Sequence, residues 1–372
     1  MLRGAGRGQQ PIEPFSTLGG RAYSSASGVA RGCFRGPFVT LDPVLSHLLS
    51  ARPAPLAAGD DPAGWYQSFH QEVLAPWQAR TNGGASASGR DHFAHGLLGG
   101  FVADRPAWAL VAGHQAAVRR LAWERGGLDL VPDGGIVAFC ASEEGGAHPR
   151  AVHSSLRKAP DGGFRLEGQK RWATLAPSAA ALLVIASLGR DGDRNRLRAL
   201  CVPSDRSGIG IAPMDLGDRK PSNPEVRHAV VDLSSVPVAA GEVMDGDGYT
   251  DAIKPFRTIE DLYIGAATTA YNLALARRSG WPEAAVEDLL LLLVAAGALA
   301  FGPLDEPAAH LGVAALSRAT ARVRADHEEH WALVDEAAAA AGRRAAGGGG
   351  VAARAQELRR QGAWTRLAAS ST

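Results

Sequence analysis

The sequence predicts an α+β protein with an N-terminal helical domain, a central antiparallel β domain and a C-terminal helical bundle. Three observations predict this order. Apolar residues recur at helical spacing up to about residue 122, short β-branched runs follow from Ile136, and long helical patterns resume at Gly248. We expect an irregular leader at 1–37, an N-terminal helical domain at 38–132, a β domain at 133–245 and a C-terminal helical domain at 246–372.

The N-terminal helices are predicted from four amphipathic stretches between about Leu41 and Ala122. They read LDPVLSHLL, GWYQSFHQEVLAPWQA, DHFAHGLLGGFVAD and PAWALVAGHQAAVRRLAW. Each has apolar residues three and four positions apart, which places them on one face of a helix. The turn-forming run Asp133-Gly134-Gly135 then ends the helical pattern.

Six short runs in the middle of the chain predict strands: IVAFC, GFRLEG, ALLVIAS, RLRALCVP, GIGIAP and VRHAVVDL. The run Asp161-Gly162-Gly163 indicates a tight turn. Because no helical pattern separates these runs, we expect a compact antiparallel domain.

Helical patterns return in the last third of the chain. One runs from Gly248 to Arg278, a second covers WPEAAVEDLLLLLVAAGALA, and a third extends over residues 305–341. Pro282 suits the first turn of the second helix. We expect a flexible break at Gly347–Gly350 and a final helix over VAARAQELRRQGAWTRLAA.

Composition narrows the class of partner. Lys+Arg 39 against Asp+Glu 38 gives a net charge of +1, which indicates no general nucleic-acid partner. The longest apolar run, residues 289–304, is shorter than the ~20 residues that span a bilayer, so we expect a buried core helix and no membrane span. Three distant cysteines indicate neither a disulfide framework nor a metal site, and favour a cytoplasmic location. The leader allows the alternative of a targeting signal.

Two segments about two dozen residues apart are typical of one enzyme family. FCASEEGGAHP, residues 139–149, and LEGQKRWATLAPSAAALLVI, residues 166–185, resemble conserved segments of the acyl-CoA dehydrogenases. The order of helical, β and helical thirds agrees with this, and the resemblance covers about residues 95–280. The positions that match in residue type are Phe139, Ser142, Glu143, Gly145, Gly168, Lys170, Trp172 and Thr174.

The resemblance implies an FAD site. In this family the matching tryptophan, here Trp172, covers the flavin ring, and the matching threonine, Thr174, bonds near flavin N5. Phe139, Ala141 and Ser142 would lie at the pyrimidine edge of the ring. Residues two apart on a strand share a face, so Trp172 and Thr174 can address the same ring. The alternative is that Trp172 is a core aromatic.

The substrate side of the site is less well matched. His148 stands where the family has a serine near the substrate's thioester, and the alternative is a loop histidine without a role. Glu143 and Glu144 are a possible catalytic pair, but we expect solvated loop acids at both positions.

The family's proton-abstracting glutamate has no clear counterpart. Its usual C-terminal position falls between Glu336 and Glu357, where the sequence has no acid. Some members carry the base on the first C-terminal helix, and there Glu260 lies one residue from the position, which the ungapped register gives to Ile259. As the base, Glu260 needs a pKa raised by burial. Otherwise we expect a surface or interface acid paired with Arg257.

Two flavin-nucleotide motifs of the family are also missing. ARRSGWPEAAVED replaces its Arg-x-Gln-Phe-Gly, and GRRAAGGGG lacks the glutamine of its Gln-x-x-Gly-Gly. The leading hypothesis is an FAD-dependent oxidoreductase acting on an acyl-CoA or acyl-carrier thioester, as a homo- or hetero-oligomer. The alternatives are a non-catalytic subunit of a hetero-oligomeric acyl-CoA dehydrogenase and a flavin monooxygenase of the same fold.

Overall fold

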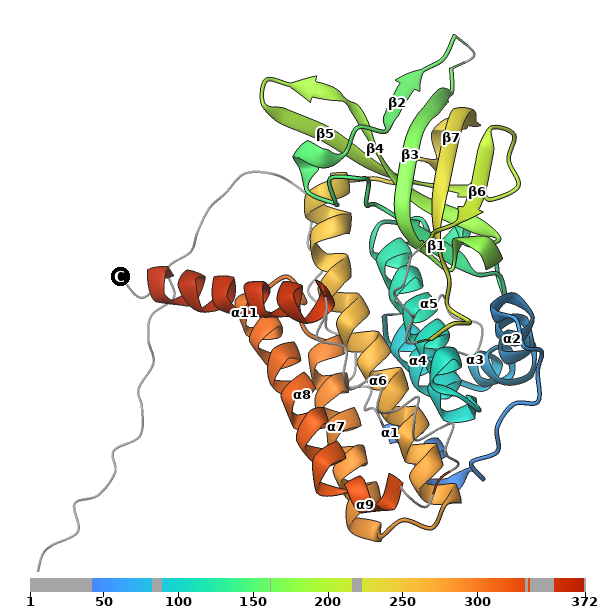
Figure 1. The fold of residues 1–372 in the computed structure, drawn as a ribbon, viewed down its shortest axis with the longest axis vertical. Helices are drawn as coiled ribbons and strands as arrows, with labels where there is room; N and C mark the ends of the chain where they lie inside the picture. Colours follow the sequence, from blue (N-terminus) through green and yellow to red (C-terminus); the bar gives the residue numbers. More distant parts are fainter. Residues whose placement is uncertain are drawn as a thin grey trace, which may run out of the picture. The chain divides into compact units, whose positions relative to one another are not determined.

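A curled β domain lies at one end of a set of long helices in the computed structural model (Figure 1). The structure describes residues 42–81, 89–160, 162–215, 223–331, 334 and 351–370, all within one unit of the chain, residues 40–372. The predicted leader at 1–37 and the predicted break at 347–350 lie outside the described residues.

The N-terminal helices form where amphipathic stretches predicted them, and stacked aromatic rings join them. Asp61 caps α2 by accepting a hydrogen bond from the N–H of Gly64 at 2.9 Å. Trp65 of α2 then stacks on Trp108 of α5, with ring centroids 5.6 Å apart. The elements are α1 (Asp42–Ser50), α2 (Pro62–Phe69), the π-helical turn η1 (His70–Leu74), α3 (Ala75–Thr81), α4 (Gly89–Val102) and α5 (Pro106–Glu124).

All six predicted strands form, but the sheet is mixed rather than wholly antiparallel. The strands are β1 (Val137–Cys140), β2 (Ser155–Lys158), β3 (Phe164–Thr174), β4 (Ala181–Asp191), β5 (Arg194–Pro203), β6 (Ile209–Pro213) and β7 (His228–Val238). They pair in the order β1-β4-β2-β3-β7-β6, and β5 pairs with β4. β1 runs parallel to β4, and β2 pairs with β4 in parallel at Ser155 and Ser187. The seventh strand, β2, was not predicted, because only one of its four residues, Leu156, is buried and its sequence has no apolar pattern.

The sheet has apolar side chains on both faces. Along β4, Leu183 and Ile185 belong to the core shared with the helices, whereas Leu182 and Val184 belong to a second core inside the β domain. A strand buried on both faces reads as a continuous apolar run, which is what residues 181–187 show. The helical core therefore continues onto one face of the sheet and fixes the β domain against α5.

The C-terminal helices differ from prediction at two places. The third helix ends at Asp326 rather than continuing, because His327 leaves helical geometry and contacts Asp288 of α7 at 2.9 Å. α7 is not fully buried, since Leu291 is 65% and Val294 43% exposed. The elements are the π-helical turn η6 (Gly248–Ile253), α6 (Lys254–Arg278), α7 (Glu283–Ala300), α8 (Pro307–Asp326), α9 (Glu328–Trp331) and α11 (Val351–Ser370).

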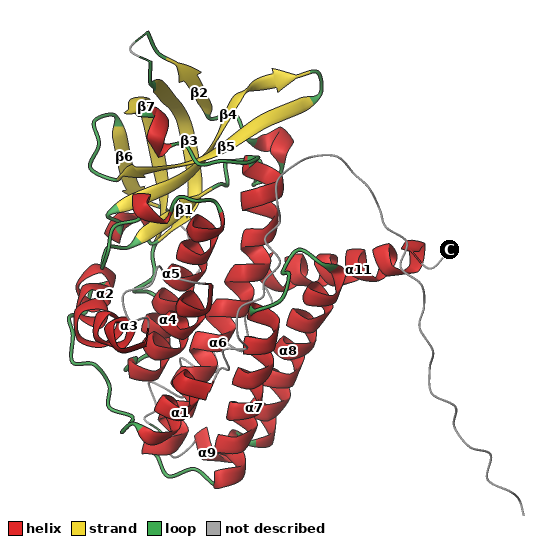
Figure 2. Cartoon of the chain, turned by 180° about the vertical axis from the view of Figure 1, so that it is seen from behind, coloured by secondary structure: helices red, strands yellow, loops and turns green. Residues whose placement is uncertain are grey.

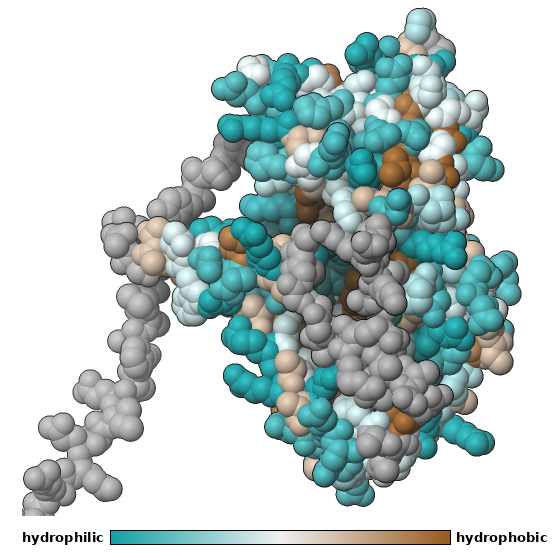
Figure 3. Space-filling view, in the orientation of Figure 1, coloured by the Kyte–Doolittle hydropathy of each residue, from teal (hydrophilic) through white to brown (hydrophobic). Residues whose placement is uncertain are grey.

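The helix α6 extends from the β domain through the helical layer, and α11 crosses α8 (Figure 2). On the face drawn in Figure 3, hydrophilic residues cover most of α8, α11 and the β domain, and a small cluster of hydrophobic residues lies on the right side of the β domain. Within the described residues, every helix is too short or too polar to cross a membrane.

Candidate functional site

A bulge near the end of β3 turns Trp172 outward. The ladder between β3 and β7 is interrupted after Lys170 and resumes at Ala173, so two residues of β3 stand opposite one of β7. At the bulge the N–H of Arg171 leaves the ladder and donates to the carbonyl of Ser142 at 2.8 Å. Trp172 adopts the left-handed conformation, with φ of 59°, and is 45% exposed.

The exposed Trp172 shares a face with two polar side chains. A bulky residue at positive φ costs about 1–3 kcal/mol and persists only where its surroundings hold it. Its ring lies edge-on to His228 with centroids 5.6 Å apart, and Oγ1 of Thr174 is 3.1 Å from Nδ1 of His228. Trp172 is therefore not the core aromatic that the sequence allowed as an alternative, and it faces the same side as Thr174.

A buried ion pair ties the first family-like segment to the second. Glu143 accepts from Nζ of Lys170 at 2.7 Å and from the N–H groups of His153 and Ser154 at 2.8 and 3.0 Å. Burial alone would raise the pKa of Glu143, but Lys170 and the two N–H groups hold it below its usual value. The expectation of a solvated acid is wrong for Glu143, whereas Glu144 is exposed.

The other predicted cofactor residues lie on the segment that this ion pair holds. Phe139, half-buried at the end of β1, packs on Phe256 of α6 with ring centroids 4.1 Å apart. Ala141 is buried and Ser142 is half-buried beside the β3 bulge. The structure thus brings Phe139, Ala141 and Ser142 to the end of β3 that carries Trp172.

His148 stands apart from this group. It is exposed, and its Nδ1 accepts from the N–H of Arg150 at 3.2 Å. Its ring lies 6.4 Å from that of Tyr249, between centroids. These contacts place His148 on the outer loop, near the start of η6.

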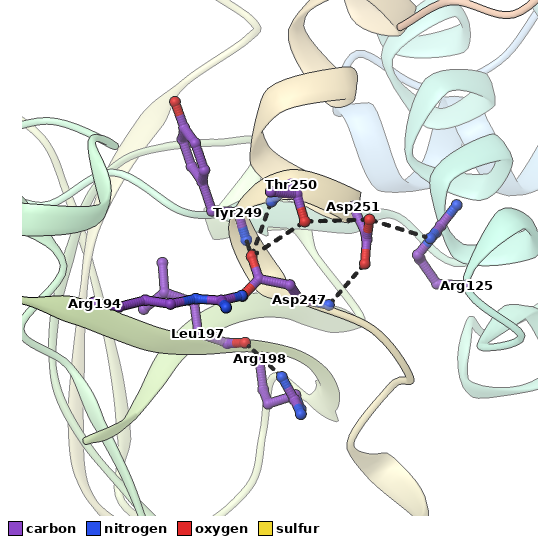
Figure 4. A network of polar contacts seen from close by, with 8 residues as sticks. All are labelled: Arg125, Arg194, Leu197, Arg198, Asp247, Tyr249, Thr250 and Asp251. Carbon is purple, nitrogen blue, oxygen red and sulfur yellow. Dashed lines mark hydrogen bonds and ion pairs between the residues drawn. The ribbon is translucent and has the colours of Figure 1, made fainter. Parts of the chain in front are cut away.

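The start of the first C-terminal helix is fixed by a polar network (Figure 4). Asp247 caps η6 by accepting from the N–H groups of Tyr249 and Thr250 at 2.9 and 3.0 Å, and Asp251 accepts from the N–H of Asp247 at 2.8 Å. A Cβ at Gly248 would lie 2.9 Å from the backbone nitrogen of Arg198, so only glycine fits here. This network determines where α6 leaves the β domain.

Helices α5 and α6 approach each other closely enough to join their side chains. A Cβ on Gly113 would lie 2.6 Å from Cα of Ile264 and 2.8 Å from the carbonyl oxygen of Tyr263. This approach leaves the next residue, His114, facing the turn of α6 that carries Glu260. Nδ1 of His114 is 3.0 Å from Oε1 of Glu260.

Glu260 is nearly buried and pairs with both His114 and Arg257. Its Oε2 accepts from Arg257 at 2.8 Å, which is the predicted pair, and its side chain is 12% exposed. Burial alone would raise the pKa of Glu260, but His114 and Arg257 together lower it. The predicted rise of the pKa is therefore wrong, and so is the alternative of a surface acid. Ile259 is fully buried.

The helix pair and the strand end are electrostatically coupled. Burial lowers the pKa of His228, His114 lowers it further, and Glu260 opposes them. Phe256 links the two sides, since it packs on Phe139 and meets His114 edge-on with ring centroids 6.0 Å apart. The site therefore has a sheet side with the exposed tryptophan and a helix side with a histidine–carboxylate pair.

Sequence reasoning missed His114 and His228. His114 lies alone in VAGHQAA and meets a partner 146 positions away, so no local pattern marks it. His228 lies within the predicted strand VRHAVVDL and becomes visible only through the β3–β7 pairing of Thr174 with His228.

A flavin ring is compatible with the sheet side. Such a ring needs a flat apolar wall and a hydroxyl near its redox nitrogen, and Trp172 and Thr174 supply both on one face. The family's nucleotide-binding arginine and glutamines have no match in this sequence. The residues present therefore fit the flavin ring, whereas the nucleotide half of FAD would have to be bound by groups outside these motifs.

The β domain also carries a groove outside this site. The groove, of about 680 Å³, is lined by residues of β2, β4 and β5 and by none of the predicted site residues. Among the described residues, no group of three His, Cys, Asp or Glu side chains is placed to hold a metal ion. Cys140 and Cys201 are free and buried.

Comparison with known proteins finds one family model and several solved structures that are similar to this chain. The family model of the acyl-CoA dehydrogenase middle domain matches residues 138–228, which include the sheet side of the site. No curated protein matches the sequence. A crystal structure of an FAD-dependent dehydrogenase has a TM-score of 0.61 at 14% identity, and the match covers 88% of this chain and 97% of that one.

Two further solved structures are similar. The acyl-CoA dehydrogenase from Geobacillus kaustophilus has a TM-score of 0.59 at 14% identity, over 82% of this chain and 89% of that one. The glutaryl-CoA dehydrogenase from Mycobacterium smegmatis has a TM-score of 0.57 at 14% identity, over 87% and 93%. These findings confirm the predicted resemblance: the chain has the acyl-CoA dehydrogenase fold, and residues 138–228 match that family's middle-domain model.

Proposed function

We propose that this chain binds FAD and acts as an oxidoreductase of acyl-CoA dehydrogenase type on an acyl thioester. The observation that carries the proposal is Trp172, a large aromatic held at positive φ and 45% exposed beside Thr174. An exposed, strained aromatic has no structural advantage, and strain of this kind concentrates at ligand-binding positions. A planar ring stacked on Trp172 would bury the apolar surface that this side chain exposes to solvent.

The surrounding residues support distinct roles in this proposal. Thr174 and Ser142 offer hydroxyl groups to the ring, while the Glu143–Lys170 pair holds their two segments together. The flavin accepts hydride from the substrate when bound. His148, on the outer loop, is the predicted neighbour of the thioester end, and the carrier there is either coenzyme A or a carrier protein.

Binding of the nucleotide half of FAD would require a second subunit. Because the family's motifs for it are missing, a second subunit, identical or not, would complete the site. The exposed Leu291 and Val294 on α7 offer an apolar surface for association. Sedimentation of the purified chain at micromolar concentration tests this, and a pure monomer would count against it.

The visible spectrum of the purified protein tests flavin binding directly. We expect flavin absorption bands in wild type and their weakening or shift in Trp172→Ala, because the stacking wall is lost. The matched control is Trp364→Ala on α11, an exposed tryptophan far from β3 in the chain, which should leave the spectrum unchanged. Identical spectra for wild type and Trp172→Ala after reconstitution with FAD would reject the stacking role.

A second candidate function is a non-catalytic subunit that completes the flavin site of an active partner. The observation that favours it is the lowered pKa of Glu260, since a carboxylate paired with both His114 and Arg257 is a poor proton acceptor. Such a subunit would give no flavin spectrum alone and would gain one only with its partner chain. A flavin monooxygenase, which needs no such base, would instead consume oxygen when its flavin is reduced.

A further inference from the structure

The helix side of the site contains a buried nitrogen with no partner. Nε2 of His114 is inaccessible to solvent and makes no hydrogen bond within the described part of the chain. The histidine side chain as a whole is only 2% exposed. Buried polar atoms are normally paired, so an unpaired one suggests that a ligand atom belongs beside it.

The partner of the other ring nitrogen determines what Nε2 can do. Glu260 has a lowered pKa and remains ionised, so its carboxylate can only accept hydrogen bonds. Nδ1 of His114, 3.0 Å away, must therefore be the donor. In the neutral imidazole, Nε2 then carries the lone pair and is free to accept a proton.

Ring contacts connect His114 to the sheet side of the site. His114 meets Phe256 edge-on, and Phe256 packs on Phe139, which precedes the segment with Ser142. The charge of His114 also acts on His228, the residue that contacts Trp172 and Thr174. The groups that act on His114 are thus Glu260 and Arg257 from α6 and His228 from β7.

We propose that His114 is the proton acceptor of this site and that Glu260 is its positioning residue. The C–H bond next to the thioester carbonyl would break, its proton would bond to Nε2, and its electron pair would form a C=C bond as hydride leaves the neighbouring carbon. Bound flavin would supply the hydride acceptor. The carboxylate of Glu260 stabilises the imidazolium that forms and, by holding the proton on Nδ1, keeps Nε2 free to accept. This inference rests on the proposed function, and it replaces the missing glutamate by a histidine–glutamate pair.

The tautomer of His114 tests the proposal without flavin or turnover. In the ¹⁵N-histidine-labelled protein at pH 8, long-range ¹H–¹⁵N spectra should show His114 protonated at Nδ1 and bare at Nε2. His114→Gln assigns the signals. Glu260→Leu should shift the population toward the Nε2–H form, whereas Glu260→Gln keeps an acceptor and should retain much of the Nδ1–H form. A wild-type His114 protonated at Nε2 overturns the proposal.

Proton exchange tests the chemical role. Wild type incubated with butyryl-CoA in D₂O should incorporate deuterium next to the carbonyl, measured by mass spectrometry. His114→Gln should slow this by about 10²–10⁴-fold, the usual contribution of a general base. Glu260→Gln should have an intermediate effect on the exchange rate, since a neutral amide stabilises the imidazolium less.

Two matched controls separate this role from folding. His310→Gln removes another buried histidine that contacts α6, through Thr258 at 3.1 Å, and Asp261→Asn removes the carboxylate next to Glu260. Both should exchange at about the wild-type rate. Exchange that survives His114→Gln overturns this inference alone, while a normal flavin spectrum still supports the proposed function. No exchange by wild type overturns the acyl thioester as substrate and this inference with it.

Discussion

Two buried glutamates, Glu143 on the sheet side and Glu260 on the helix side, differ in how their hydrogen-bond networks end. Glu143 is 7% exposed, and it accepts from Lys170 and two backbone N–H groups. Lys170 is itself fully buried, with its nitrogen also near the carbonyl of Ala141. Glu260 is paired on one side with Arg257, but on the other with His114, whose far nitrogen has no partner.

The difference separates a closed network from an open one. The carboxylate oxygens of Glu143 and Nζ of Lys170 all end on other protein atoms, so their role is to hold Ser142 beside Trp172. The chain from Arg257 through Glu260 to His114 ends in a buried lone pair instead. A buried charge therefore does not by itself identify a functional site, and the unpaired Nε2 of His114 is the additional observation on the helix side.

The largest expected effect is on the closed network. Lys170→Met would leave Glu143 buried without its counter-charge, which costs about 3–5 kcal/mol of unfolding free energy. Chemical denaturation measures this loss. The double variant with Glu143→Leu should recover most of it, because a buried pair can be replaced by apolar side chains. A loss below 1 kcal/mol in Lys170→Met would mean that Glu143 is not held as described.

A pH titration of stability distinguishes the glutamates from the buried histidines. The pKa values of Glu143 and Glu260 are lowered, so the stability they contribute is present above about pH 4.5 and lost as pH falls through their folded values. Burial lowers the pKa of His92 to about 3, so the unfolded state binds its proton first. His92 alone should therefore cost about 2 kcal/mol as pH falls from 6.5 to 5.

Thermal or chemical unfolding at several pH values checks this separation. His92→Gln should reduce the loss of stability between pH 6.5 and 5, to which His95 also contributes, while Glu143→Gln and Glu260→Gln should leave that interval almost unchanged. If either glutamine variant removes the slope above pH 5, the lowered pKa of that glutamate is in error.

The sequence anticipated the sheet side far better than the helix side. Trp172 and Thr174 lie two residues apart in one segment, so local spacing alone placed them on one face, although it did not show the bulge. That bulge depends on the bond from Arg171 to Ser142, a contact between segments about 30 residues apart. The helix side depends on a backbone approach at Gly113 that brings His114 to Glu260, and no one-dimensional pattern encodes such an approach.

The close approach of α5 and α6 can be tested at Gly113. Gly113→Ala places a methyl group 2.6 Å from Cα of Ile264, so the helices must separate, at a cost of about 1–3 kcal/mol. Gly265→Ala on α6, where a Cβ meets nothing within 4 Å, is the matched control and should stabilise by about 0.5–1 kcal/mol. We also expect Gly113→Ala to weaken the Nδ1–H form of His114. An unchanged His114 signal would show that the pair does not depend on this approach.

The smallest expected effect concerns the cap that sets the start of α6. Asp247→Ala removes the acceptor for two N–H groups of η6, and N-cap losses of this kind cost about 0.5–2 kcal/mol. Asp247→Asn keeps a side-chain oxygen and loses only the pair with Arg194, whose side chain is 71% exposed, so it should remain close to wild type. Unfolding by denaturant measures both variants. Because the cap lies three turns before Glu260 and on the same continuous helix, Asp247→Ala should also broaden the His114 signal, while the Glu143–Lys170 pair stays intact. Equal losses in the alanine and asparagine variants would show that the ion pair, rather than the cap, fixes this end of the helix.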